Sequence, residues 1–344
     1  MKKIMLFIAF ALFLAGCTQP APETTPETAP EAVREPAVDV VEAERLHVVT
    51  TTFPQFDFVR QIAGDRVELT MLLSPGAESH SFEPSPRDII ALNNADLFVY
   101  VGGDREVWVE PVLASLENER ITALPLMGMV DTVLIQEIAE GMEYDDDHDD
   151  DNHGDDHDDD HDDDHDHNEE PDEHVWTSPR NAIQIVQGLT DILSAMDPAN
   201  ADYFSANAAA YIAELQALDE AFAEVVAGSA RRTIVFGDRF PFRYLTEHYG
   251  LTYYAAFTGC STETQASPAT VAFLINKIQE EEIPVVLHLE LLNHQMPDII
   301  AESTGARPLE LHSAHNVSQA DFDAGITFLD IMRRNVELLR EALN

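Results

Sequence analysis

Cysteine and basic side chains are scarce in this sequence of 344 residues. It has two cysteines, Cys17 and Cys260, and 19 lysines and arginines against 64 aspartates and glutamates. The few basic residues argue against nucleic-acid binding, because phosphate contacts need clustered lysine and arginine. The formal net charge of −45 is better suited to a protein that binds a cation. If Cys17 is modified at its sulfur, as argued next, the pair cannot form a disulfide framework.

The amino terminus has the pattern of a secretory signal. Lys2 and Lys3 precede an apolar run from Ile4 to Leu14, which is shorter than the roughly 20 residues of a membrane-spanning helix. The following Leu-Ala-Gly-Cys17 resembles a bacterial lipobox, and the cysteine stands where cleavage is expected. We therefore predict a lipoprotein signal peptide at 1–17, and a protein anchored to the cell membrane, outside the cytoplasm, by a lipidated Cys17. The alternative is a plain signal peptide with an incidental cysteine.

Two further segments have compositions that cannot bury a core. Residues 18–44 are rich in Pro, Glu, Thr and Ala, which predicts a disordered tether. Residues 143–173 hold 20 acidic side chains and 6 histidines but no lysine or arginine. Such charge density predicts a disordered Asp/His-rich loop. Our hypothesis is that this loop raises the local Zn²⁺ concentration or senses zinc abundance, without forming the main site.

From residue 45 onward, short β-branched runs alternate with helical patterns, which predicts an α/β fold. We expect two lobes at 45–198 and 228–344, each a parallel β-sheet flanked by helices, joined by a long rigid linking helix at 199–227. The expected strands are 46–51, 67–73, 97–101, 233–236, 251–257, 284–289 and 308–311. The expected helices are 56–63, 86–94, 181–196, 242–249, 268–281, 296–304 and 320–343.

Potential metal ligands follow several of these strands. Ligands of open parallel sheets bind beyond the carboxyl ends of the strands. His80 lies after the second strand, and His174 stands immediately before a helix. The four strands of the second lobe end near the following candidates: Asp238, Cys260, His288 with Glu290, and His312.

The segments around the first two histidines resemble those of a known family. Residues 76–88 read Gly-Ala-Glu-Ser-His-Ser-Phe-Glu-Pro-Ser-Pro-Arg-Asp, and residues 174–179 read His-Val-Trp-Thr-Ser-Pro. These motifs, and Ala-Asp-Leu-Phe-Val-Tyr at 95–100, resemble the zinc/manganese-binding solute-binding lipoproteins of metal ABC importers. The Asp/His-rich loop lies where zinc-type members carry a His-rich loop. The resemblance extends from about Leu46 to the carboxyl terminus.

The resemblance implies one metal between the lobes, with one ligand from each of four segments. It assigns the first two ligands to His80 and His174, and the fourth to His312, where the family usually has an aspartate. The third ligand, usually a histidine, falls where this sequence has Gly237. Asp238 is the nearest replacement, and the following residues remain open as alternatives: Cys260, His288, Glu290 and His315.

A set of imidazoles with one carboxylate at most suits Zn²⁺ better than Mn²⁺, which prefers oxygen ligands. The resemblance therefore implies a monomeric protein, not an enzyme, that captures Zn²⁺ and delivers it to the membrane permease of an ABC importer. Three alternatives remain: a manganese-binding member of the family, a surface adhesin or metal buffer active in cell adhesion, and an extracytoplasmic zinc hydrolase. Neither a His-Glu-x-x-His helix nor a nucleophile elbow supports the hydrolase.

Overall fold

The structure, a computed structural model, describes residues 45–79, 82–136, 139–142, 170–259, 261, 265–291 and 294–344. The predicted signal peptide with Cys17, the tether, His80 and Cys260 lie outside these ranges, as do residues 143–169 of the Asp/His-rich segment. Glu44–Asn344 form one unit by their internal contacts. Within the described residues, no helix is both long and apolar enough to cross a membrane.

The first lobe is a four-stranded parallel sheet in the order β2-β1-β3-β4. Alternate side chains of its strands enter two cores. Val48 and Val99 belong to the core that contains α1, while Val49 and Phe98 pack with residues of α2 and α3. The strands and helices of this lobe are β1 (Leu46–Thr50), α1 (Phe53–Ala63), β2 (Val67–Met71), α2 (Pro86–Asn93), β3 (Leu97–Tyr100), α3 (Val109–Ser115), β4 (Thr122–Pro125) and α4 (Pro179–Met196). Short 3₁₀ turns lie at Gly64–Arg66, Asp104–Glu106, Leu126–Met129 and Val175–Thr177.

The second lobe repeats this strand order. β5 pairs with β7, and β9 pairs with β10, all in parallel. A parallel bridge between Phe236 and Leu287 joins the two pairs, which gives the order β7-β5-β9-β10. The elements are β5 (Thr233–Val235), β6 (Arg239–Phe240), α6 (Arg243–Tyr249), β7 (Thr252–Tyr254), β8 (Phe257–Thr258), α7 (Pro268–Glu280), β9 (Val285–His288), α8 (Gln295–Thr304), β10 (Arg307–Glu310), α9 (Gln319–Asp323) and α10 (Phe328–Ala342).

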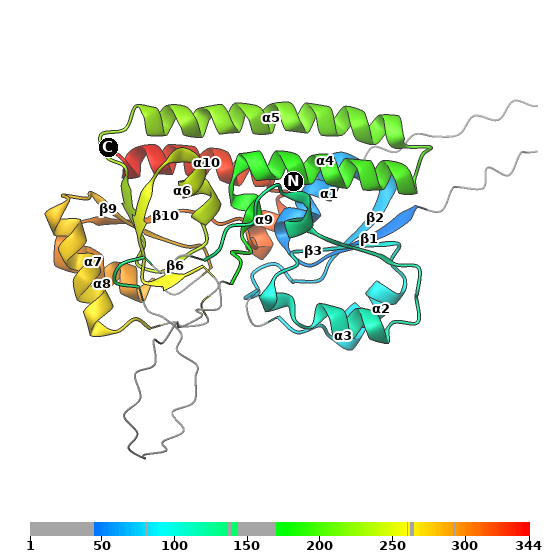
Figure 1. Cartoon of the computed structure of the whole chain (residues 1–344), viewed down its shortest axis with the longest axis horizontal. Coiled ribbons are helices and arrows are strands. Elements are labelled where there is room, and N and C mark those ends of the chain that lie inside the picture. The colour runs from blue at the N-terminus through cyan, green and yellow to red at the C-terminus, as the bar shows by residue number, and fades with distance from the viewer. Residues whose placement is uncertain are drawn as a thin grey trace, which may run out of the picture. The chain divides into compact units, whose positions relative to one another are not determined.

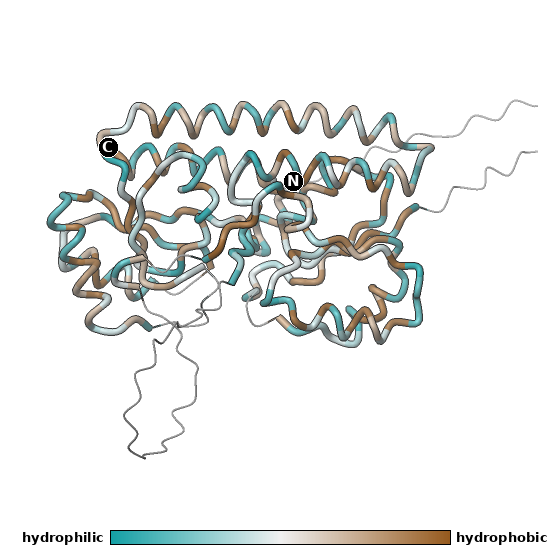
Figure 2. The backbone as a smooth tube through the Cα atoms, in the orientation of Figure 1, coloured by the Kyte–Doolittle hydropathy of each residue, from teal (hydrophilic) through white to brown (hydrophobic). Residues whose placement is uncertain are grey.

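The linking helix α5 (Ala201–Ala227) packs along helices of both lobes. It contacts α1 and α4 of the first lobe and α6 and α10 of the second (Figure 1). Its 27 residues extend about 40 Å at 1.5 Å per residue. Figure 2 shows apolar residues recurring along this helix between polar ones. A helix held along its length by both lobes restricts how far one lobe can move on the other.

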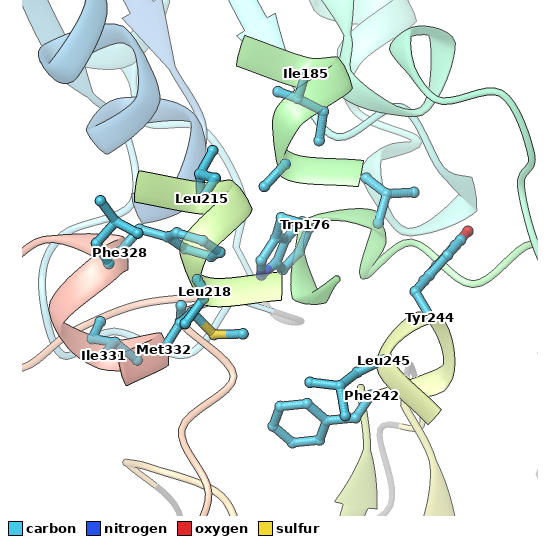
Figure 3. Close-up of a cluster of buried hydrophobic side chains, with 14 of the residues drawn as sticks. Trp176, Ile185, Leu215, Leu218, Phe242, Tyr244, Leu245, Phe328, Ile331 and Met332 are labelled. Carbon is cyan, nitrogen blue, oxygen red and sulfur yellow. The ribbon is translucent and has the colours of Figure 1, made fainter. Parts of the chain in front are cut away.

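One apolar core extends from the first lobe into the second under α5. Trp176 is fully buried in it, with Leu215 and Leu218 of α5 on one side and Leu245 of α6 on another (Figure 3). Phe328 of α10 lies in the same core. Its backbone N–H donates a 2.6 Å hydrogen bond to Asp57 of α1. The lobes are therefore joined by packing and by direct hydrogen bonds as well as by α5.

The structure confirms the α/β class and the parallel sheets, and it corrects three details. The helix predicted at 320–343 is two helices, α9 and α10, because Gly325 has a φ of 76° between them. The strand predicted at 251–257 is divided into β7 and β8. Asp172 and Glu173, which fall within the segment predicted to be disordered, are buried. The domain boundaries themselves remain a prediction.

Candidate metal site

His174 is held in a fixed orientation between the lobes. It is 1% exposed, and its Nδ1 lies 3.1 Å from Oδ1 of Asp172. The same carboxylate oxygen accepts the backbone N–H of His174 at 2.9 Å. A carboxylate partner favours the tautomer with Nδ1 protonated, which leaves the Nε2 lone pair as the metal-binding donor. This is the outer-partner arrangement that orients histidine ligands in metal sites.

Gly259 packs directly against the His174 ring. A Cβ atom at position 259 would lie 3.1 Å from Nδ1 and Cε1 of His174 and 2.8 Å from the carbonyl oxygen of Phe240. Only glycine allows the backbone to approach this closely without a shift. The second lobe therefore forms one wall of the His174 position.

Trp176 connects His174 to the last ligand-bearing segment of the chain. Its Nε1 donates a 3.0 Å hydrogen bond to the carbonyl oxygen of Ser313. Its ring centroid lies 5.5 Å from that of His174 and 5.0 Å from that of His315. The His174 and His315 rings are themselves 5.5 Å apart at an interplanar angle of 89°. The structure therefore places His315 beside His174.

His315 also meets the loop that leads to His80. Oγ of Ser79, the residue before His80, lies 3.3 Å from Nδ1 of His315. The neighbouring Asn316 donates from Nδ2 to the carbonyl oxygens of Ser74 and Ala77, at 2.9 Å each. The first-lobe loop is thus fastened to the second lobe at the point where His80 follows.

The turn before His315 is built around Ala314 in a left-handed conformation. Ala314 is fully buried with a φ of 60°, a strained value for a residue with a Cβ. Its N–H donates a 2.9 Å hydrogen bond to Nδ1 of His312. Asn335 fixes His312 in turn, accepting its N–H at 3.1 Å and donating to its carbonyl oxygen at 2.7 Å. His312 therefore uses Nδ1 to stabilise the turn that aims His315.

Glu290, in the segment after β9, supports the same turn. Its two carboxylate oxygens accept the N–H of Ser313 at 2.8 Å and the hydroxyl of Ser313 at 2.5 Å. Its Oε1 is also 3.3 Å from Nδ1 of His312. The Ser313 hydroxyl accepts the N–H of His315 at 3.2 Å. Glu290 is thus engaged in the scaffold around His315.

The third-ligand segment has a different geometry from the one expected. A Cβ atom at Gly237 would lie 3.1 Å from Cα of Pro297 and 3.2 Å from Cδ1 of Ile300, both on α8. A side chain at position 237 would therefore point into α8 and not toward His315. The residue of this segment that lines a cavity together with His315 is Arg239.

Asp238 lies at the carboxyl end of β5. Burial raises the pKa of its carboxyl group, and this effect is partly offset by the backbone N–H groups of Arg239 and Leu289 and by the charge of Arg239. Oδ1 accepts the Arg239 N–H at 2.8 Å, whereas Oδ2 is buried with no hydrogen-bond partner among the described residues. The nearby His288 points Nδ1 at the Leu289 carbonyl oxygen and packs on His294, with ring centroids 4.2 Å apart.

A second acid with a raised pKa lies on the first-lobe side of the site. Glu106 accepts the Gly102 N–H at 2.9 Å, and burial raises the pKa of its carboxyl group to about 7. It lines a cavity of about 30 Å³ together with Glu173 and His315. Sequence patterns did not single out Glu106, because it stands in a short run of charged residues, which is typical of an exposed turn.

Within the ranges that the structure describes, no three His, Cys, Asp or Glu side chains lie close enough together to hold a metal ion. His174 and His315 supply two potential ligands of a candidate site. Ser79, the residue before His80, contacts His315.

A family model described as zinc-uptake complex component A, periplasmic (ZnuA), matches residues 48–342. The chain belongs to the ZnuA family. It is 31% identical to the high-affinity zinc uptake system protein ZnuA of Bacillus subtilis, over 88% of this chain and 89% of the relative. It is 30% identical to the zinc-binding lipoprotein AdcA of Streptococcus pneumoniae, over 99% of this chain but only 61% of the relative.

Solved ZnuA-type structures have the same two-lobe fold. The Zn(II)-bound ZnuA-like domain of S. pneumoniae AdcA superimposes with a TM-score of 0.68 at 28% identity, covering 87% of this chain and 99% of that domain. The metal-dependent lipoprotein YcdH of B. subtilis gives a TM-score of 0.69 at 27% identity, with the same coverage. The chain spans about three fifths of the length of the AdcA relatives.

Proposed function

We propose that this protein captures Zn²⁺ outside the cytoplasm and delivers it to the membrane permease of an ABC importer. The observation that carries the proposal is the pairing of His174 with His315 between the lobes of a ZnuA-family fold. The names of the relatives, a zinc-binding lipoprotein and a high-affinity zinc uptake protein, support zinc as the cargo. The family role is binding and delivery, so no catalysis is assigned.

For the zinc ligands we propose His174, His315 and His80. The first two are brought together by Trp176, and the third follows Ser79, whose Oγ lies 3.3 Å from Nδ1 of His315. Three neutral imidazoles fit Zn²⁺, which accepts nitrogen ligands in tetrahedral geometry, and leave a fourth position. In this proposal His315 takes the place predicted for His312.

In this proposal Asp238 and His312 support the site and do not bind the metal. His312 holds the Ala314 turn through Nδ1. Asp238 lies near His288, directly before Arg239 of β6. Cys17 is proposed as the lipidated anchor, and the relatives named as lipoproteins support that assignment.

Metal analysis tests the proposal directly. Full-length protein carrying Cys17→Ala, which cannot be lipidated at that position, is purified, loaded with Zn²⁺ and freed of excess metal. We expect one tightly held Zn²⁺ per chain, and a strong preference for Zn²⁺ over Mn²⁺ in competition. In the parent organism, deletion of the gene should slow growth in zinc-depleted medium, and added zinc should restore it. Protein that retains no stoichiometric zinc would refute the proposal.

A further inference from the structure

The hydroxyl group of Tyr244 joins helix α6 to two chain segments that precede His174. Tyr244 is 1% exposed, and its hydroxyl lies at the end of a side chain that extends away from α6 (Figure 3). The hydroxyl donates a 2.7 Å hydrogen bond to the carbonyl oxygen of Asp172 and accepts the N–H of Leu134 at 3.1 Å. This one side chain therefore satisfies a backbone acceptor in one segment and a backbone donor in the other.

Leu134 and Asp172 belong to a short pairing of these two segments. The N–H of Asp172 donates to the carbonyl oxygen of Leu134 at 2.8 Å, and an antiparallel bridge joins Ile135 to Pro171. The pairing fixes the two segments on each other. The Tyr244 hydroxyl then ties the paired segments to the second lobe.

Asp172 is also the residue that orients His174. Its Oδ1 accepts the His174 N–H at 2.9 Å and lies 3.1 Å from Nδ1 of the ring. The carbonyl oxygen bound by Tyr244 and the carboxylate bound to His174 belong to one residue, so a shift of its backbone also displaces the carboxylate. Because Asp172 is only 2% exposed, a hydrogen bond lost there is not readily replaced by one to bulk water. The orientation of His174 thus depends on Tyr244 through Asp172.

The second lobe holds the other neighbours of the His174 ring as well. Gly259 packs against the ring, and the centroid of the His315 ring lies 5.5 Å away. Tyr244 fixes Asp172 to the same lobe as these two residues. The carboxylate partner of His174, the wall behind its ring and its fellow histidine are therefore all positioned by one lobe.

We propose that Tyr244 is a positioning residue for zinc binding. Its hydroxyl holds Asp172 in the place from which the carboxylate keeps Nδ1 of His174 protonated and Nε2 free for the metal. Tyr244 does not itself bind zinc. The inference rests on the proposed function, and His174 is the ligand it concerns.

A double-mutant cycle tests whether the hydroxyl acts through Asp172. Zinc dissociation constants are measured by chelator competition for the full-length Cys17→Ala parent, and for Tyr244→Phe, Asp172→Ala and the double variant in that parent. Asp172→Ala should weaken zinc binding by about 10–100-fold, as is typical for the outer partner of a ligand. Tyr244→Phe, which keeps the ring and removes the hydroxyl, should weaken it by about fivefold, near the net worth of one hydrogen bond. In the Asp172→Ala background the same change should cost less than about twofold, because the carboxylate through which it acts is gone.

Tyr249→Phe is the matched control on the same helix. The Tyr249 hydroxyl donates a 2.7 Å hydrogen bond to Asp219 of α5, away from the His174 segment. Removing it should lower the melting temperature of the zinc-free protein and leave zinc affinity at the parent value. A thermal melt of every zinc-free variant accompanies the affinity measurements.

Two results would overturn the inference. In one, Tyr244→Phe melts at a lower temperature but binds zinc as tightly as the parent, which assigns the hydroxyl to stability alone. In the other, Tyr244→Phe weakens zinc binding by the same factor with and without the Asp172 carboxylate. Parent protein that holds no stoichiometric zinc would instead refute the proposed function.

Discussion

The imidazole rings of His174 and His315 stand nearly perpendicular, at 89°, with their centroids 5.5 Å apart. One lies in the segment before α4 and the other in the loop after β10, far apart in the sequence. Trp176 contacts both rings and is hydrogen-bonded to Ser313, so the pair is held by the core and not by flexible loops alone. A metal site built on this pair would join the lobes directly.

Replacing His174 with alanine should weaken zinc binding by more than about a hundredfold, because outer partners of metal ligands alone are worth about 10–100-fold. His47→Ala is a matched control: His47 lies at the amino-terminal end of β1, and its side chain is 39% exposed beside Glu68. Chelator competition on the two proteins gives the comparison. Equal affinities would remove His174 from the site.

His312 and His315 can be distinguished by replacing each with a residue of chosen hydrogen-bonding capacity. His315→Ala should abolish tight zinc binding. His312→Asn should keep most of the affinity, because an asparagine side chain can accept the N–H two residues on, as Nδ1 of His312 does from Ala314. His312→Ala, which leaves that N–H without its acceptor, should bind more weakly than His312→Asn.

The opposite ranking would return His312 to the ligand set. In that case His312→Asn and His312→Ala would lose zinc equally, whereas His315→Ala would retain it. Zinc stoichiometry and a thermal melt of each variant, measured together, show whether a loss comes from the site or from the fold.

Glu106 should make the zinc-free protein less stable as pH rises. Its pKa is about 7 in the folded state against 4.5 as a model value, so the folded state binds the additional proton between these pH values. The free energy of unfolding therefore falls as pH increases from about 4.5 through 7, by up to about 3 kcal/mol for this group. Glu106→Gln, which keeps an acceptor for the Gly102 N–H, should gain stability relative to the parent at pH 8 but not at pH 4.5.

Denaturant unfolding at the two pH values measures this difference. The exposed Glu117→Gln serves as the control, and its stability relative to the parent should change little between them. A Glu106→Gln protein whose relative stability is the same at pH 4.5 and pH 8 would contradict the assignment of a raised pKa to Glu106.

Deleting residues 145–168, the centre of the Asp/His-rich segment, should leave the tight zinc site intact, because the proposed ligands lie elsewhere in the chain. The deletion should remove weak additional zinc binding, which a titration at high protein concentration detects. If the deleted protein loses its single tightly bound zinc, the segment itself holds the main site, and the ligand proposal fails.

The pattern of short β-branched runs and amphipathic helices was enough to predict the class of fold, its two sheets and the long helix α5. These features depend on local periodicity, which is readable from sequence. The break between α9 and α10 was missed because a helical pattern continues across Gly325, and β4 was missed because four residues carry little signal. Motif resemblance singled out His174, and its buried position beside Asp172 agrees with a ligand role.

The sequence by itself indicated the family and the presence of histidines suited to zinc, and Leu-Ala-Gly-Cys17 predicts an extracytoplasmic lipoprotein. Only the tertiary structure decided which residues meet. The backbone direction at Gly237 turns its side-chain position toward α8, the left-handed Ala314 aims His315 at His174, and Arg239 lines the neighbouring cavity. Such outcomes depend on how distant segments pack together and on single backbone angles, and neither is encoded in the spacing of residues along the chain.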